Sequence, residues 1–213
     1  MALIRRVHKP SIAFRAMGGV AIGVGWHTRI AIVVAVASLI VEVVYEYRFH
    51  NLFISLSLLA LLPAGSLGSG AQISHAISDR NTFSATLFII LTCDLYLNGA
   101  WIKWRSAQFR SGASLQQMLY VSRVLRPLLK HPEYWHPRWL ESYFAHSPGL
   151  AKMMATGVLV IECLLPVLLL LPATYWIAVA TGVGLHLSFS AILPVRLVPF
   201  GASVVGSYLA FKS

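Results

Sequence analysis

Long apolar stretches separated by short polar turns dominate the pattern of this chain. They predict six helices, at residues 11–25, 29–45, 51–63, 82–104, 149–171 and 174–193. A last apolar stretch at 197–210 forms either a further short span or one arm of a terminal hairpin. Four of the six helices approach the ~20 residues that cross the hydrocarbon layer, and the first and third need tilt or protein neighbours. The pattern predicts an all-α membrane protein, a polytopic helical bundle of five to seven membrane segments.

Two connections between the predicted helices differ in character. Residues 64–81 are rich in Gly and Ser, which predicts an irregular loop. Residues 105–148 mix arginines with Trp and Tyr, a composition typical of the lipid headgroup region. We therefore expect one membrane domain over residues 1–213, with an interfacial amphipathic loop at 105–148.

The composition agrees with a membrane protein. Hydrophobic residues make up 57% of the chain and charged residues 11%, whereas a soluble domain has roughly 25% charged residues. The charge is unbalanced, with 17 Lys and Arg against 7 Asp and Glu. These cations lie between apolar runs, so we expect them to meet anionic lipid at the basic loop and not nucleic acid.

The distribution of cations also bears on orientation. The cations near the N-terminus favour a cytoplasmic N-terminus. If the first predicted helix spans, the basic loop is cytoplasmic too. We expect a plasma or inner membrane as the location.

Helix 82–104 carries two polar faces. Tyr96, Gly99 and Lys103 share one face at helical spacing. The opposite face carries Asp94, Asn98, Trp101 and Arg105. Polar groups within a membrane are costly, so both faces should contact protein or a cavity. For Lys103 alone, the alternative is a snorkelling anchor at the end of the helix.

Three further ionisable residues lie in or beside predicted spans. Glu162 is near the middle of helix 149–171, and Pro166 leaves its backbone carbonyl without a helical partner. His186 is in the middle of helix 174–193, with Ser190 one turn later. His50 precedes helix 51–63. Each has a structural alternative as a packing or interfacial residue.

Connectivity groups these residues into one candidate site. If the four helices after residue 50 all span, His50 and Lys103 face the same side of the membrane. We therefore expect His50, Lys103 and His186 to line one cavity, with Glu162, Tyr96 and Ser190 placed to hold a ligand there. Ionisable groups gathered in a cleft are typical of a functional site.

Several short segments have the order and spacing of motifs in a known family. They are Ile22–Arg29, Phe49–Phe53, Tyr96–Lys103, the Glu-x-x-x-Pro of Glu162–Pro166, Leu185–Ser190 and Val198–Gly201. By these motifs the chain resembles the membrane domain of the vitamin K-dependent gamma-carboxylase superfamily, also called HTTM proteins. The resemblance extends over about residues 15–210. It implies Lys103 as the base that takes a proton from a quinol, with His50 and His186 in the same pocket. It also implies that the Lys103 face lies in the lumen or periplasm, opposite to the cytoplasmic side that the cations favour.

Two functions follow from these observations. The first is a small redox or carboxylase-like membrane enzyme that uses a quinone or quinol, favoured by Lys103, His50 and His186. The second is a non-catalytic membrane subunit or assembly factor of a larger membrane complex. The second is favoured by departures from the family, such as Ile102 where a second lysine is common and the missing counterpart of the large soluble domain. No metal site is expected.

Overall fold

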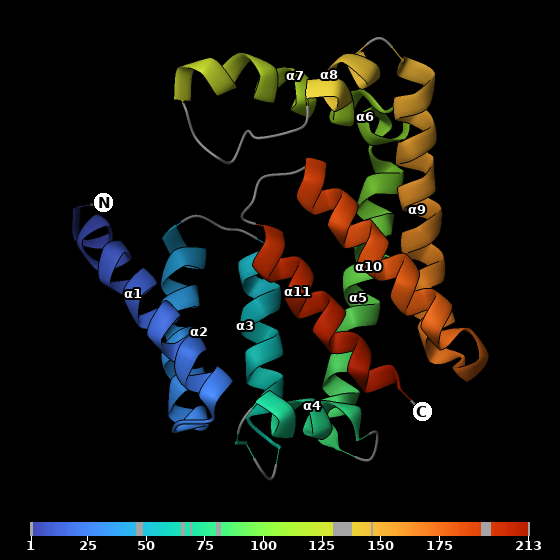
Figure 1. Ribbon diagram of the computed structural model, residues 1–213. Helices are drawn as coiled ribbons and strands as arrows, with labels where there is room; N and C mark the ends of the chain where they lie inside the picture. The colour runs from blue at the N-terminus through green and yellow to red at the C-terminus, as the bar shows by residue number, and fades with distance from the viewer. Residues whose placement is uncertain are drawn as a thin grey trace. The chain divides into compact units, whose positions relative to one another are not determined.

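The computed structural model describes residues 2–45, 49–64, 67–68, 70–79, 82–129, 138–145, 147–192 and 197–212. Every regular element within these residues is a helix, and none of them forms a strand (Figure 1). The all-helical class predicted from the apolar pattern is therefore confirmed. The chain divides into two compact units, one made of residues 1–92 and 206–213 and the other of residues 93–205.

The first unit is built around a hairpin of α1 (Ala2–Val24) and α2 (Thr28–Tyr45). The turn between them uses positive φ angles at Gly25 and His27. Helix α3 (Phe49–Leu61) packs beside α2.

Small and polar side chains hold α1 against α2. Ser11 and Ser38 each donate a hydroxyl hydrogen bond to the other's backbone carbonyl, at 3.1 and 2.6 Å. One turn along the hairpin, Arg15 forms an ion pair with Glu42. Gly18 lies so close to α2 that a Cβ atom there would be 3.1 Å from the carbonyl oxygen of Ala31. The two helices therefore satisfy each other's polar groups.

The remaining parts of the first unit come from distant segments of the chain. Helix α4 (Gly70–Ser78) packs on the C-terminal 3₁₀ helix η3 (Tyr208–Phe211). The hydroxyls of Thr92 and Ser207 form a buried hydrogen bond of 2.7 Å. Residues 64–81 are thus not an irregular loop throughout, because packing against η3 gives this Gly- and Ser-rich segment a helix of its own.

The second unit begins within α5 (Phe83–Arg105), which starts in the first unit. Helices α9 (Pro148–Leu170) and α10 (Tyr175–Ile192) form a hairpin through the 3₁₀ turn η2 (Pro172–Thr174). Helix α11 (Leu197–Ser207) follows and ends in the first unit.

The described residues of the basic segment between α5 and α9 form three further helices. They are α6 (Ala107–Arg110), α7 (Ala113–Leu129) and α8 (Arg138–Ala145). Leu119 of α7, Phe144 of α8 and Ala151 of α9 form a buried cluster that fixes this segment to the end of α9. The side chains of Arg123, Trp139 and Tyr143 are exposed. Lys130, Tyr134 and Trp135, which contribute to the same composition, lie outside the described residues.

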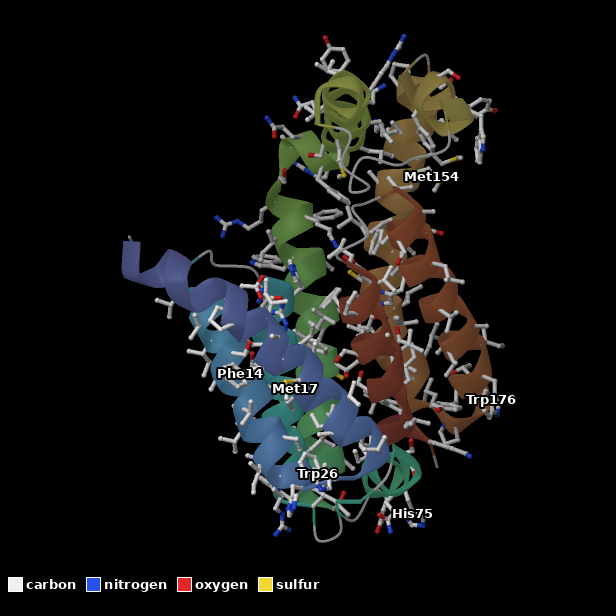
Figure 2. All side chains as sticks on the ribbon, turned by 60° about the vertical axis from the view of Figure 1, so that its left-hand side comes forward. Phe14, Met17, Trp26, His75, Met154 and Trp176 are labelled. Atoms are coloured by element: carbon white, nitrogen blue, oxygen red, sulfur yellow. The ribbon has the colours of Figure 1, made fainter. Side chains whose placement is uncertain are left out.

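Among the described residues, three helices are long and apolar enough to cross a membrane, namely α5, α9 and the segment from η2 through α10. Large apolar side chains on several helices are exposed, as expected of surfaces that face lipid. Phe14 and Met17 of α1 and Trp176 of α10 are examples that project from their helices (Figure 2). The part of the chain that the structure describes thus holds three potential membrane spans, and the bundle of five to seven segments remains a prediction.

Candidate functional site

Helices α5, α9 and α10 bring four of the predicted site residues into two interacting pairs within the second unit. Lys103 of α5 forms an ion pair with Glu162 of α9. The hydroxyl of Tyr96, two turns earlier on α5, lies 2.8 Å from Nε2 of His186 on α10. The face of α5 predicted from Tyr96 and Lys103 therefore points towards protein.

The Lys103–Glu162 ion pair is asymmetric in its exposure. The Lys103 side chain is 28% exposed and the Glu162 side chain 6%, so the carboxylate lies deeper than the ammonium group. Nζ of Lys103 also lies over the rings of Phe109 and Phe189, 5.7 Å from each centroid. A cation over an aromatic face is attracted by the ring quadrupole. Lys103 is therefore turned towards Glu162 and these rings.

One oxygen of the Glu162 carboxylate is buried without a hydrogen bond. Oε2 has no partner among the described residues, whereas Oε1 is bonded to Lys103. Gly99 lies beside this oxygen, because a Cβ atom there would be 3.8 Å from Oε2 and 3.9 Å from Nζ of Lys103. Buried polar atoms nearly always have a hydrogen-bond partner, so Oε2 is a candidate acceptor for a further donor.

Aromatic rings surround the imidazole of His186. Phe189 and Phe200 contact it edge to face, with centroid distances of 6.1 and 6.0 Å. A Cβ atom on Gly201 would be 3.4 Å from Cβ of His186, so α11 approaches α10 closely here. Phe189 contacts both Lys103 and His186 and therefore connects the two polar pairs. Phe189 was not among the predicted site residues, and the one feature of the sequence that could have indicated it is its position within the Leu185–Ser190 motif.

The other predicted site residues lie elsewhere or bond differently. The hydroxyl of Ser190 donates to the backbone carbonyl of His186 at 2.9 Å, within its own helix. His50 is half-buried in α3 and belongs to the first unit. The second unit therefore brings together Lys103, Glu162, Tyr96 and His186, and the shared cavity with His50 stays a prediction.

The second polar face of α5 is not covered by the described residues of the chain. Asp94, Asn98, Trp101 and Arg105 are all exposed. The guanidinium of Arg105 lies 6.0 Å from the ring centroid of Trp101. The described residues of this chain leave the face open, because α9 and α10 lie on the side of Lys103 and Tyr96. Contact of this face with another protein stays a prediction.

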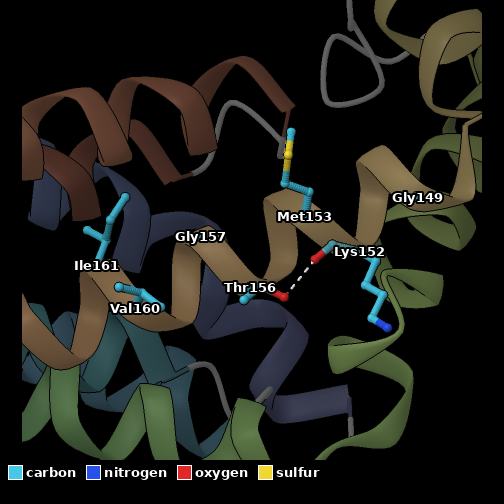
Figure 3. A pocket seen from close by; sticks show the side chains of 7 residues that line it. All are labelled: Gly149, Lys152, Met153, Thr156, Gly157, Val160 and Ile161. Atoms are coloured by element: carbon cyan, nitrogen blue, oxygen red, sulfur yellow. Dashed lines mark hydrogen bonds between the residues drawn. The ribbon is translucent and has the colours of Figure 1, made fainter.

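A shallow groove runs along the outer face of α9, from Gly149 to Ile161 (Figure 3). All of its lining residues come from this one helix, and Lys152 lies near its N-terminal end. Gly157 opens the middle of the groove, while Thr156 bonds back to the carbonyl of Lys152. The groove is an open surface feature, separate from the Lys103–Glu162 ion pair.

Comparison with protein-family models, with curated proteins and with solved structures gives no match. The resemblance to the gamma-carboxylase superfamily therefore stays an interpretation of the sequence motifs. Any function must be argued from the polar pairs themselves.

The two pairs define what the site can do chemically. An unpartnered carboxylate oxygen can accept a hydrogen bond or a proton, and the adjacent ammonium group can stabilise an anion. Tyr96 and His186 form a second hydrogen-bonded pair. The ring of Phe189 contacts both His186 and Lys103 and so lies between the two pairs. Among the described residues no cluster of His, Cys, Asp and Glu is arranged to hold a metal ion.

Proposed function

We propose that this integral membrane protein binds a lipid-soluble ligand with a hydroxyl group, of the quinol class, beside the Lys103–Glu162 ion pair. The buried, unpartnered Oε2 of Glu162 carries the proposal. A hydroxyl is a neutral donor that can enter from the bilayer together with an apolar ligand. Gly99 supports the same position, because it keeps the space beside Oε2 free of a side chain.

The proposed chemistry is proton transfer from the bound hydroxyl. The ligand O–H bond breaks, a new O–H bond forms on Oε2 of Glu162, and the ammonium of Lys103 stabilises the resulting oxyanion. In this arrangement Glu162 is the base and Lys103 stabilises the anion that forms, whereas the family resemblance implies Lys103 as the base. In a redox or carboxylase-like enzyme, this proton transfer would be the first step.

Binding of a short-chain naphthoquinol to the purified protein in lipid nanodiscs tests the proposal. We expect the quinol to bind and its dimethyl ether, which lacks the hydroxyl donors, to bind much more weakly. A hydrogen bond to a charged group contributes about 1.5–3 kcal/mol, so Glu162→Gln should weaken binding by roughly ten- to a hundredfold. Equal binding of the quinol and its ether would contradict the proposal.

A glycine pair separates ligand binding from folding. Gly99→Ala fills the space beside Oε2 and leaves the ion pair in place, so it should also weaken quinol binding. Gly184→Ala is the matched control, because a Cβ atom there meets no other atom within 4 Å. If both variants bind the quinol like the wild type, the ligand does not lie beside Gly99.

Lys103→Ala should abolish turnover if the site is catalytic.

The alternative function is that of a non-catalytic subunit or assembly factor in a larger membrane complex. The polar face of α5 favours it. Asp94 and Asn98 are exposed on a helix that can span the membrane, and polar groups at that depth are costly unless another protein covers them. For such a subunit, Lys103→Ala would leave the activity of the complex unchanged. The two functions are therefore distinguished by the same substitution.

We further propose a plasma or inner membrane location with the basic segment on the cytoplasmic side. The exposed cations and rings of this segment, such as Arg123 and Trp139, support contact with anionic headgroups. At the end of α5, the guanidinium of Arg110 lies 5.9 Å from the ring centroid of Trp104. Aromatic residues paired with cations at a helix end are typical of the membrane boundary.

A further inference from the structure

The exposed residues Asp94, Asn98, Trp101 and Arg105 form one face of α5, here called the α5 polar stripe. Asp94 lies at the midpoint of α5, the depth at which a spanning helix crosses the centre of the bilayer. Neither Asp94 nor Asn98 has a side-chain hydrogen bond or ion pair with the described part of the chain. Arg105 is three turns away and lies against Trp101.

We propose that the α5 polar stripe binds a membrane-spanning helix of another protein that carries a Lys or Arg near its midpoint. A carboxyl group facing hydrocarbon is costly, and such groups in membrane proteins almost always face protein or water. A basic side chain at the same depth complements Asp94 in charge. Asn98, one turn away, adds an amide that can hydrogen-bond across the interface. This inference specifies a partner for the subunit alternative and is independent of the quinol site.

A second copy of this chain fits the stripe less well. Copies inserted with the same orientation would pair about a two-fold axis along the membrane normal. Such an axis places Asp94 opposite Asp94, which brings like charges together at the centre of the bilayer. Charge therefore favours a basic helix from a different protein over a homodimer.

Synthetic single-span helices of Leu and Ala provide a direct probe. One peptide carries Arg at its centre and a matched peptide carries Leu there, and binding to the purified protein is followed by fluorescence anisotropy in lipid bicelles. We expect the Arg peptide to bind more tightly than the Leu peptide. Asp94→Leu should remove most of this preference, a loss of about tenfold, and Asp94→Asn should remove part of it.

The controls make each outcome decisive. Asp79→Asn, at an exposed position outside the predicted spans, should leave peptide binding unchanged. Equal affinity for both peptides, or full affinity after Asp94→Leu, overturns the proposal. Disulfide-linked dimers of an Asn98→Cys variant lacking Cys93 and Cys163 would show that a second copy covers the stripe. Quinol binding by Asp94→Leu should equal that of the wild type, so failure of one proposal is distinguishable from failure of the other.

Discussion

Replacing Gly112 by alanine should destabilise the second unit strongly. Gly112 joins α6 to α7 with a φ angle of +80°, a conformation that costs an L-residue about 1–2 kcal/mol. A Cβ atom there would also lie 2.5 Å from the carbonyl carbon of Ala151 and from the backbone nitrogen of Lys152. Overpacking against groups that cannot move adds about 1–3 kcal/mol. We therefore expect a loss of roughly 2–5 kcal/mol in the free energy of unfolding.

Unfolding in mixed micelles with rising SDS measures this loss. Gly112→Asn separates its two causes, because asparagine tolerates positive φ but still carries a Cβ atom. The asparagine variant should recover about 1 kcal/mol relative to alanine and remain less stable than the wild type. Gly184→Ala, where the added Cβ has open space, should be neutral or stabilising by up to about 1 kcal/mol. A Gly112→Ala variant as stable as the wild type would refute the close approach of α6–α7 to α9.

Three further predictions concern other sites. Tyr96→Phe removes the hydrogen bond to His186 and should lower the free energy of unfolding by about 1–3 kcal/mol in the same assay, and an unchanged value would contradict a buried bond. Lys152→Gln should reduce the anionic phospholipid that native mass spectrometry detects on the protein, since Lys152 is the cation of the α9 groove. Retention of the full amount would place that lipid elsewhere. A single cysteine at the exposed Gln117 should resist a membrane-impermeant reagent in intact cells, and labelling there would reverse the proposed orientation.

The potential membrane spans α5 and α9 were predictable because apolar length is a local property. Residues 82–104 and 149–171 differ by one residue at each end from α5 and α9. The grouping of Tyr96 with Lys103 on one face of α5 also followed from helical spacing, which did not indicate which of the two polar faces points inward. The start of α1 did not, because the helix begins at Ala2 and contains Pro10, whereas proline is normally found in the first turn of a helix.

The missed features depend on contacts between distant segments. Helix α4 has nine residues, too few to be stable in isolation, and it forms where it packs on η3. The pairing of Lys103 with Glu162 depends on how α5 and α9 rotate about their axes, which spacing within one helix does not determine. The exposure of Asp94 depends on which side of α5 the neighbouring helices occupy. Sequence reasoning identified these residues but not their contacts.

If α1 and α2 are membrane segments, as the apolar pattern predicts, their hairpin has a consequence for how the chain enters the membrane during synthesis. An isolated α1 would present Arg15 and the hydroxyl of Ser11 to lipid, and a lone arginine opposes insertion by about 2.5–3.5 kcal/mol at the helix centre. Glu42 and Ser38 satisfy these groups only after α2 has left the ribosome. The two helices should therefore integrate together as one helical hairpin, so that α1 waits in an aqueous or interfacial site until α2 arrives.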